Sequence, residues 1–315
     1  MVGMGGDWAL SLVGDGLAMI WIVGDKGMLG TELSLAAQAV GAPHIGTDRE
    51  VNILDIAALR DFARQHNPDW IVNCAAYTAV DKAEDEPELC RRLNVEGPAN
   101  LGRVAAETGA SILHLSTDYV FSGDASEAYR EDDPAGPTGV YGRTKAEGET
   151  ALCAICSNAV VVRTAWLYGK HGANFVYTML RLMRQKERIG VVADQRGSPT
   201  WTRDLAKAIL AIILSPKHRY GIYHYTGEGE TTWWEFAQAI RDEGLKTGLL
   251  ARPCEVQALT TAEYPTKARR PAYSVLSKEK IGRDYGIVPP DWRVSLAIFI
   301  GELSRDPEAL RIVNL

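Results

Sequence analysis

The sequence predicts an α/β fold: a doubly wound parallel sheet of the Rossmann type with a smaller C-terminal substrate-binding region. Three observations predict it. Short apolar segments alternate with amphipathic helical segments over the first half of the chain. A glycine-rich turn at residues 24–30 separates the first strand from the first helix, and the alternation becomes irregular after Trp166. Strands that are apolar throughout are buried on both faces, as in sheets built from βαβ units.

The elements follow in order along the chain. The expected strands are "MIWIV" (19–23), "HIGTD" (44–48), "WIVNCAA" (70–76), "SILHLST" (111–117) and "AVVVRTA" (159–165). The expected helices run to Ala39 from the glycine turn, over 56–66, 87–108, about 141 onwards and about 174–185. In "TTWWEFAQAI", Thr232 and Glu235 form a capping-box pattern at the start of a further helix.

This order predicts the domain organisation. Residues 1–18 are glycine-rich without the cationic start of a secretory signal, and we interpret them as a leader or tag, with folding expected from Met19. Residues 19–170 form the expected dinucleotide-binding domain, against which 190–225 pack back. Residues 171–189 and 226–315 form the expected substrate-binding region.

Composition excludes several function classes. A net charge of −6 argues against a general nucleic-acid binder, and no apolar run reaches the ~18 residues of a membrane span. Five cysteines, an odd number in a long chain, favour reduced thiols and a cytoplasmic location. The spacing of Cys153 and Cys156 favours helix packing over a zinc or redox site. The six histidines form no HExxH pattern, so no metal is expected.

The glycine turn predicts a dinucleotide site. Gly24, Gly27 and Gly30 lie between a strand and a helix, where they permit a tight turn and let backbone N–H groups approach a pyrophosphate. Asp48, about twenty residues later, can bind the adenosine ribose hydroxyls and repel a 2′-phosphate, which favours NADH. Arg49 beside it could accommodate that phosphate, so NADPH stays open.

A second set of polar residues lies at the same edge of the sheet. Thr117 and Asp118 end the fourth strand, and ligands of such sheets bind at the carboxyl ends of the strands. Tyr141 and Lys145 lie one helical turn apart, 24 residues after Thr117. A lysine and a tyrosine on one helix face also occur on ordinary solvated helices. It is the nearby strand end at Thr117 and Asp118, together with the glycine turn, that favours a catalytic interpretation of the pair.

The motifs together resemble the extended short-chain dehydrogenase/reductase family, and within it most closely the dTDP-4-dehydrorhamnose reductases. The matching strings include "GDKGMLG", "VNCAAYTAVDKAEDEPELCRRLN", "STDYVF", "VYGRTKAEGE", "RTAWLYG", "DQRGSPT" and "YPTKARRP". The likeness extends in order over residues 19–310. It implies an NADH- or NADPH-dependent reduction of the C4 ketone of dTDP-4-dehydro-6-deoxy-L-mannose to dTDP-L-rhamnose, a precursor of cell-surface polysaccharide.

The resemblance also implies catalytic roles. Tyr141 would donate the proton to the developing alkoxide, and a nearby positive charge from Lys145 would ease its loss, since a free phenol titrates near ~10. Lys145 would also bind the nicotinamide ribose. Thr117 would donate to the carbonyl oxygen, in the place where relatives usually carry serine.

Further positions carry binding roles by resemblance. The dinucleotide is expected to contact Gly24, Gly27, Met28, Leu29, Gly30, Asp48, Asn52, Ile53, Ala75, Ala76, Tyr77 and Lys145. The sugar nucleotide is expected to contact Thr117, Asp118, Tyr141, Trp166 and Arg270. Asp118 could instead cap a turn, Trp166 could be core packing, and Arg270 could be a solvated surface residue. The alanines could reflect ordinary strand packing.

Two other functions stay open at this stage. The same fold and motif set occur in a non-catalytic regulatory subunit of methionine adenosyltransferase, which predicts nucleotide binding without sugar turnover and a stable partner protein. A related nucleotide-sugar reductase or epimerase is the other alternative. Some family members form dimers bridged by a metal ion such as Mg²⁺ through clustered glutamates, and the sequence predicts no such site in this chain. The chain is expected to be a monomer or a homodimer.

Overall fold

The computed structural model describes residues 17–312. The expected leader, residues 1–18, lies almost wholly outside these residues. The core of the structure is a six-stranded sheet in which every neighbouring pair of strands is parallel. The strands are β1 (Ile20–Val23), β2 (His44–Thr47), β3 (Trp70–Asn73), β4 (Ser111–Thr117), β5 (Ala159–Thr164) and β10 (Gly221–His224). Their spatial order is β2-β1-β3-β4-β5-β10, a doubly wound order in which the direction of the connections reverses between β1 and β3. The predicted fold class, a doubly wound parallel sheet, is confirmed.

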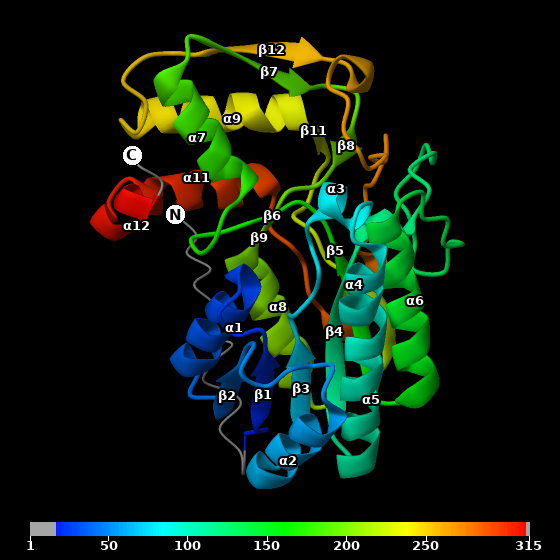
Figure 1. The fold of residues 1–315 in the computed structure, drawn as a ribbon. Helices are drawn as coiled ribbons and strands as arrows, with labels where there is room; N and C mark the ends of the chain where they lie inside the picture. Colours follow the sequence, from blue (N-terminus) through cyan, green and yellow to red (C-terminus); the bar gives the residue numbers. More distant parts are fainter. Residues whose placement is uncertain (1–16, 313–315) are drawn as a thin grey trace.

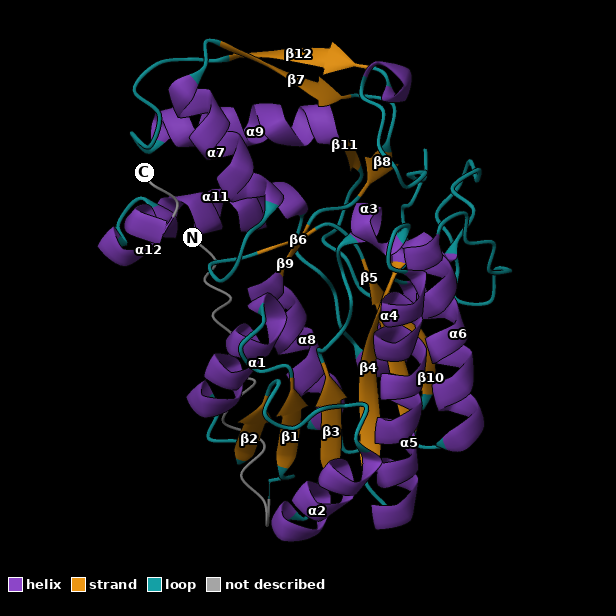
Figure 2. Ribbon diagram, in the orientation of Figure 1, coloured by secondary structure: helices purple, strands orange, loops and turns teal. Residues whose placement is uncertain are grey.

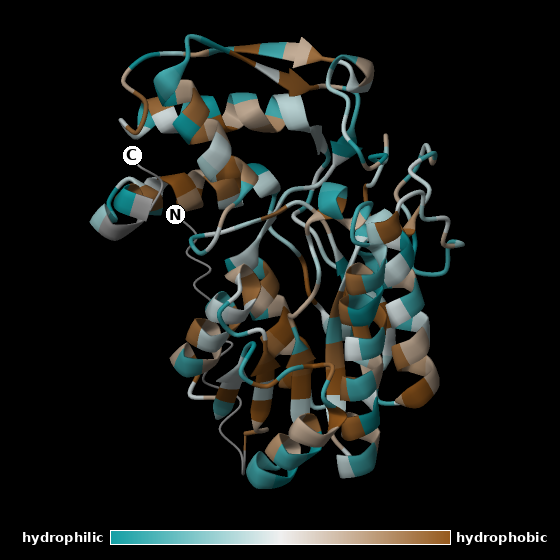
Figure 3. Ribbon diagram, viewed as in Figure 1, coloured by the Kyte–Doolittle hydropathy of each residue, from teal (hydrophilic) through white to brown (hydrophobic). Residues whose placement is uncertain are grey.

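Helices cover both faces of this sheet (Figure 1). The helices α1 (Met28–Ala39), α8 (Thr202–Ile213) and α10 (Glu279–Tyr285) pack on one face, and α2 (Ile56–His66), α5 (Gly97–Thr108) and α6 (Val140–Ile155) pack on the other. Within β1, Ile20 and Ile22 point to the first face and Trp21 and Val23 to the second. Because both sets are buried, the strand is apolar throughout, and Figure 3 shows the strands of the sheet largely in brown.

The segment expected as one helix over 87–108 contains a change of helix type. It consists of α4 (Pro87–Arg91), a π-helical turn at Arg92–Glu96 and then α5. A short helix, α3 (Val80–Ala83), precedes it. π-Helical turns inside longer helices are often found at functional sites because they re-aim one side chain. Here the turn contains Asn94, which is fully buried.

A second body lies beyond the carboxyl ends of the strands (Figure 2). It contains α7 (Phe175–Gln185), β7 (Arg188–Val192), α9 (Trp233–Lys246), β12 (Glu255–Leu259), α11 (Trp292–Leu303) and α12 (Pro307–Ile312). β7 and β12 pair in parallel, and α7, α9 and α11 share a separate apolar core around Phe236 and Trp292. The predicted capping box at the start of α9 is confirmed, with Thr232 and Glu235 bonded reciprocally.

Two short strand pairs lie between the sheet and this second body. β6 (Leu167–Tyr168) pairs with β9 (Thr200–Trp201), and β8 (Arg196–Gly197) pairs with β11 (Thr231–Thr232). The chain therefore passes several times beyond the carboxyl ends of the sheet strands, where Thr117 and Asp118 lie. Among residues 17–312, no helix has both the length and the apolar character needed to cross a membrane.

Candidate active site

The glycine turn joins β1 to α1 through backbone groups alone. Gly24 has a φ of +81°, and a Cβ added there would come within 2.9 Å of the backbone nitrogen of Ala75. A Cβ at Gly30 would collide with the carbonyl of Gly24, so the first turn of α1 packs directly on the glycine turn. Gly27 is the N-cap of α1 and supplies no side-chain cap. The first N–H groups of the helix, around Met28 and Leu29, are therefore left for an anion, which fits a pyrophosphate.

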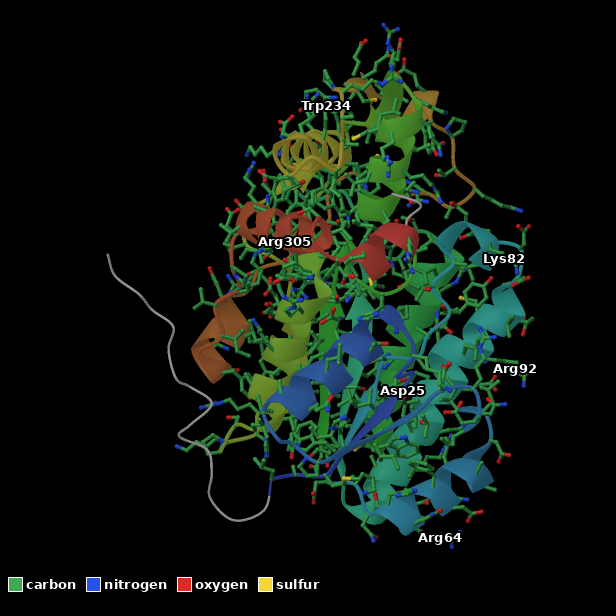
Figure 4. All side chains as sticks on the ribbon, turned by 90° about the vertical axis from the view of Figure 1, so that its left-hand side faces the viewer. Asp25, Arg64, Lys82, Arg92, Trp234 and Arg305 are labelled. Carbon is green, nitrogen blue, oxygen red and sulfur yellow. The ribbon has the colours of Figure 1, made fainter. Side chains whose placement is uncertain are left out.

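Acidic side chains lie next to this turn, at the end of β2. Asp25, labelled in Figure 4, follows β1, and its side chain fills the space beside Gly46. Burial raises the pKa of Asp25, and the carboxylates of Glu50 and Asp48 act in the same direction. Lys26 forms a salt bridge with Glu50 at 3.1 Å. A cofactor group placed here would meet mainly negative charge.

Asn52 and Ile53 lie further along the same loop. The side chain of Asn52 is exposed and accepts a hydrogen bond from the backbone of Leu54, which closes an Asx turn. Ile53 is buried and packs against Gly97, at the start of α5. The structure thus brings Asp48 to the glycine turn, while Ile53 belongs to the apolar core and only its neighbour Asn52 presents a polar side chain.

The segment after β3 is held in place by two asparagines. Ala75 packs against Gly24, and its N–H donates to Asn73 Oδ1 at 3.0 Å. Asn94 binds the backbone of Tyr77 from both sides: Oδ1 accepts from its N–H at 2.8 Å and Nδ2 donates to its carbonyl at 3.1 Å. Ala75, Ala76 and Tyr77 therefore run in a fixed path beside the glycine turn. This role of Asn94 was not predicted from the sequence, where its one signal is a polar residue inside an amphipathic helix pattern.

Thr117 ends β4 and Asp118 begins the 3-10 turn that follows; the two side chains are buried and hydrogen-bonded to each other. The Thr117 hydroxyl donates to Asp118 Oδ1 at 2.9 Å and accepts from the N–H of Tyr119. Burial raises the pKa of Asp118 to about 6. Its second oxygen, Oδ2, makes no hydrogen bond of normal geometry, although the Ser274 hydroxyl lies nearby. A buried carboxylate oxygen without a partner is costly unless a ligand supplies one, which favours a binding role for Asp118 over turn capping alone.

Tyr141 faces the same place from the first turn of α6. Its phenol lies beside Thr117, and its ring makes an edge contact with Tyr119 at 5.5 Å between centroids. Two glycines of the motif set the position of the helix: a Cβ at Gly142 would strike the carbonyl of Tyr119, and one at Gly148 the carbonyl of Asn94. Helix α6 can therefore lie close against β4 and the π-helical turn.

Lys145 lies one turn further along α6 and is buried. Its Nζ donates to the carbonyl of Leu115 at 2.6 Å and lies 3.2 Å from His114 Nε2. Burial lowers the pKa of Lys145 to about 8, and burial also raises the pKa of Tyr141. The expectation from the sequence is that the Lys145 ammonium makes the Tyr141 phenol more acidic. In the protein alone burial is the largest influence on the pKa of Tyr141, and the phenol keeps its proton, as a proton donor requires.

Trp166, two residues after the end of β5, has a strained backbone conformation. It has a φ of +48°, unusual for a bulky residue, and its ring stacks on Trp233 with centroids 3.6 Å apart. The backbone of Gly197, in "DQRGSPT", lies against the same indole: a Cβ there would come within 2.6 Å of the ring. Strained backbone of this kind concentrates at ligand sites, which favours a substrate role for Trp166 over simple packing.

Adding one methyl group at Gly197 should displace the Trp166 indole. For Gly197→Ala we expect the KM for the sugar substrate to rise ~10-fold or more with the KM for the cofactor little changed, since small displacements of positioning groups have large effects. Steady-state kinetics with each substrate varied in turn measures this. Gly301→Ala serves as a control, since Gly301 lies in the helix α11 and no atom lies within 4 Å of its added Cβ. Equal changes in both KM values would contradict the assignment.

Arg270 reaches the site from the C-terminal region. Its guanidinium pairs with Asp81 at 2.9 Å and lies 3.4 Å from the hydroxyl of Tyr119, the residue that contacts Tyr141. Arg270 is therefore not a free surface residue but part of the site's rim. The described part of the chain holds no group of three or more His, Cys, Asp or Glu side chains placed to bind a metal ion. The five cysteines are free thiols.

The raised pKa of Asp118 predicts a pH-dependent stability. An acid whose pKa is higher in the folded state binds its proton more tightly there, so its favourable contribution is complete below the unfolded pKa, near 4, and is lost as pH rises to about 6. For Asp118→Asn we therefore expect a free energy of unfolding that exceeds the wild-type value increasingly between pH 4 and 6, by up to about 2–3 kcal/mol at pH 7.

Urea unfolding of both proteins at pH 4, 5, 6 and 7 measures the Asp118 effect. Asp124→Asn, an exposed acidic residue on the following loop, is the matched control and should give a nearly constant difference. A constant difference for Asp118→Asn as well would show that burial of this carboxylate costs nothing.

The comparisons with known proteins agree with this geometry. Residues 18–305 match the family model described as the RmlD substrate binding domain. The chain belongs to this family. It is 41% identical over 286 residues to a dTDP-4-dehydrorhamnose reductase of Aggregatibacter actinomycetemcomitans, covering 89% of this chain and 97% of that protein. It is 42% identical to a probable dTDP-4,6-dihydroxy-2-methyloxan-3-one 4-ketoreductase of Streptomyces antibioticus, over 88% of this chain and 93% of that protein.

Solved structures of the RmlD family have the same fold. The crystal structure of a Bacillus anthracis dTDP-4-dehydrorhamnose reductase in complex with NADP superimposes with a TM-score of 0.85 at 35% identity, over 91% of this chain and all of that one. The resemblance predicted from the sequence motifs is therefore confirmed at the level of the family.

Proposed function

We propose that this chain reduces the C4 ketone of dTDP-4-dehydro-6-deoxy-L-mannose to give dTDP-L-rhamnose, using NADH or NADPH. One observation carries the proposal: Thr117, Tyr141 and Lys145 meet at the carboxyl end of β4, in a chain that matches the RmlD family over most of its length. Bound NAD(P)H supplies the hydride. The protein's own side chains donate the proton, bind the C4 oxygen and stabilise the phenolate that forms.

The three catalytic residues take separate roles. The Tyr141 phenol, whose pKa is raised by burial, holds the proton that the C4 oxygen receives. Thr117, beside it, donates to that oxygen, which requires its hydroxyl to turn away from Asp118 Oδ1. Lys145 is anchored by Leu115 and in its ammonium form stabilises the phenolate that remains.

We propose that the cofactor binds across the glycine turn, with Met28, Leu29 and Gly30 at its pyrophosphate. Ala75, Ala76 and Tyr77 would border it on the β3 side, and Asn52 with Ile53 would lie toward its adenine end. The carboxylates of Asp25 and Asp48 favour NADH, because they repel a 2′-phosphate. Glu50 is paired with Lys26, and Arg49 acts in the opposite direction by attracting that phosphate. The relative with NADP bound gives the opposite precedent, so the two cofactors should be assayed in parallel.

We propose that residues 171–189 and 226–315, with Trp166, Asp118 and Arg270, bind the sugar nucleotide. Arg270 would exchange its Asp81 partner for a phosphate oxygen of the diphosphate, since guanidinium pairs with both. The reduced thiols favour a cytoplasmic location, and the protein would act as a monomer or a homodimer.

Oxidation of NADH and NADPH, followed at 340 nm with dTDP-4-dehydro-6-deoxy-L-mannose generated by coupled enzymes, tests the proposal. We expect turnover with at least one cofactor and dTDP-L-rhamnose as the product. The Streptomyces antibioticus relative favours a second candidate, another dTDP-linked 4-ketosugar, which the same assay with that substrate would identify. Cofactor binding without turnover on any ketosugar would instead favour the regulatory-subunit alternative.

A further inference from the structure

A chain of three buried polar side chains leads from the middle of the sheet to Lys145. Asn73 ends β3, His114 lies opposite it on β4, and both side chains are fully buried. Asn73 Nδ2 lies 3.0 Å from His114 Nδ1, and His114 Nε2 lies 3.2 Å from Lys145 Nζ. The proposed reaction leaves the first two of these residues unused.

The hydrogen-bond partners determine which atom donates and which accepts along Asn73, His114 and Lys145. The N–H of Ala75 donates to Asn73 Oδ1, so the amide nitrogen of Asn73 must be the atom that faces His114. An amide nitrogen only donates, so His114 Nδ1 accepts. A neutral imidazole that accepts at Nδ1 carries its proton on Nε2, and burial lowers the pKa of His114 well below its ordinary value, which keeps the ring neutral.

The His114 Nε2–H therefore points at the nitrogen of Lys145. An ammonium has three N–H donors and no lone pair, so at 3.2 Å two donors would oppose each other. A neutral amine instead donates one hydrogen to the Leu115 carbonyl, accepts from the imidazole and keeps its other hydrogen free. The contact fits the neutral form of Lys145 and disfavours the charged one.

We propose that Asn73 and His114 are positioning residues: Asn73 fixes the tautomer in which His114 carries its proton on Nε2, and that N–H favours the neutral amine of Lys145. The burial of Lys145 acts in the same direction. The Asn73–His114 pair thereby sets the pH above which Lys145 loses its charge. This inference rests on the proposed function only for its catalytic consequence.

Other charged and titratable groups around Lys145 act differently. Glu149, on α6, raises its pKa, but Glu149 is paired with Arg163 of β5 at 2.7 Å. Cys90, on α4, acts in the same direction as Glu149 and shares a hydrogen bond with Thr144. Both act on Lys145 through charge, whereas the hydrogen-bond partners of Nζ are the Leu115 carbonyl and His114. The Asn73–His114 pair is therefore the side-chain partner through which one substitution can reverse the preference.

The substitution Asn73→Asp makes that reversal. One carboxylate oxygen still accepts from Ala75 N–H, and the other now accepts from His114 and draws the ring proton to Nδ1. His114 Nε2 then offers a lone pair to the Lys145 ammonium. We expect the Lys145 titration midpoint to rise by about one pH unit or more.

Nuclear magnetic resonance on the cofactor-free protein tests this without any turnover. Imidazole ¹⁵N spectra distinguish the two tautomers, with the His114 signal assigned by its loss in His114→Gln. Lysine ¹³Cε shifts report the Lys145 midpoint, assigned by Lys145→Met. The wild type should show an Nε2–H tautomer, and Asn73→Asp an Nδ1–H tautomer with the raised midpoint. A wild-type Nδ1–H tautomer, or an unmoved midpoint in Asn73→Asp, would overturn the proposal.

A double variant separates the relay from the added charge. In Asn73→Asp/His114→Gln the carboxylate is present but the imidazole is gone, so the midpoint should rise by clearly less than in Asn73→Asp alone. An equal rise would overturn the relay. If His114→Gln does not fold, the tautomer switch in Asn73→Asp decides alone; if Asn73→Asp does not fold, the wild-type tautomer decides.

The pH profile of reduction supplies the catalytic readout. If the ammonium form of Lys145 is the active one, kcat/KM falls as the pH rises through the Lys145 titration midpoint. In Asn73→Asp this fall should move to higher pH, by the same amount as the midpoint measured by nuclear magnetic resonance. If the Asn73–His114 pair had a purely structural role, Asn73→Asp would lower kcat/KM without changing the pH at which kcat/KM falls. Absence of turnover in the wild type would refute the proposed function and leave the tautomer result standing.

Discussion

Tyr141→Phe should reduce kcat by ~10²–10⁴ while leaving the affinity for NAD(P)H unchanged, because only the group that gives the proton is lost. The phenylalanine ring keeps the edge contact with Tyr119, and the helix cap at Gly139 does not involve the phenol. Steady-state kinetics gives kcat, and quenching of intrinsic fluorescence by NADH gives the affinity.

Tyr220→Phe is a matched control for the loss of a phenol. Its hydroxyl bonds with Ser111 at the amino end of β4, six residues from Thr117 and so about 20 Å from the proposed catalytic residues. We expect activity near the wild-type value. Near-wild-type activity in Tyr141→Phe would mean that another group supplies the proton.

Gly30→Ala should abolish detectable cofactor binding and lower the free energy of unfolding by about 2 kcal/mol or more. The added Cβ meets backbone, the carbonyl of Gly24 and the Cα of Asp25, and backbone in a tight turn cannot move aside as a flexible side chain can. Helix α1 would have to shift away from the turn that holds the pyrophosphate. Isothermal titration with NADH and NADPH and urea unfolding measure the two effects.

Gly301→Ala tests the same substitution in open space. It lies inside α11, and no atom lies within 4 Å of its added Cβ, so the usual helix preference for Ala should leave stability unchanged or raise it by up to ~1 kcal/mol. Cofactor binding retained by Gly30→Ala would argue that the turn has another purpose.

Sequence reasoning located the elements that depend on local pattern. The ends of β4 and α2 agree to the residue, because an unbroken apolar run and a clear amphipathic period each have sharp limits. The π-helical turn at Arg92–Glu96 was not predicted, because one extra residue in a helical turn leaves the apolar pattern of its flanks intact. What fixes it is tertiary: Asn94 bonded to Tyr77, 17 residues earlier.

The candidate site followed the same division. The spaced glycines at 24–30 and the pair Tyr141 and Lys145 are recognisable in the sequence itself, so the glycine turn and the helix α6 could be predicted from it. His114 could not, because one polar residue in "SILHLST" reads as an exception in a buried strand. Its meaning comes from β3 and α6, which lie far from it in the chain. The contact between Gly197 and Trp166 is likewise invisible until the loops are placed.

The pairing of β10 with β5 has a consequence for synthesis of the protein on the ribosome. β5 contains Val160, Val161 and Val162, and within residues 17–312 β10 is the strand that pairs with its outer edge. Residues 221–224 of β10 are translated 57 residues after Thr164. At 5–20 residues per second, a nascent chain presents this bare valine edge for about 3–11 s. Exposed edges of this kind template aggregation, so expression in cells should depend on chaperone capacity during that interval.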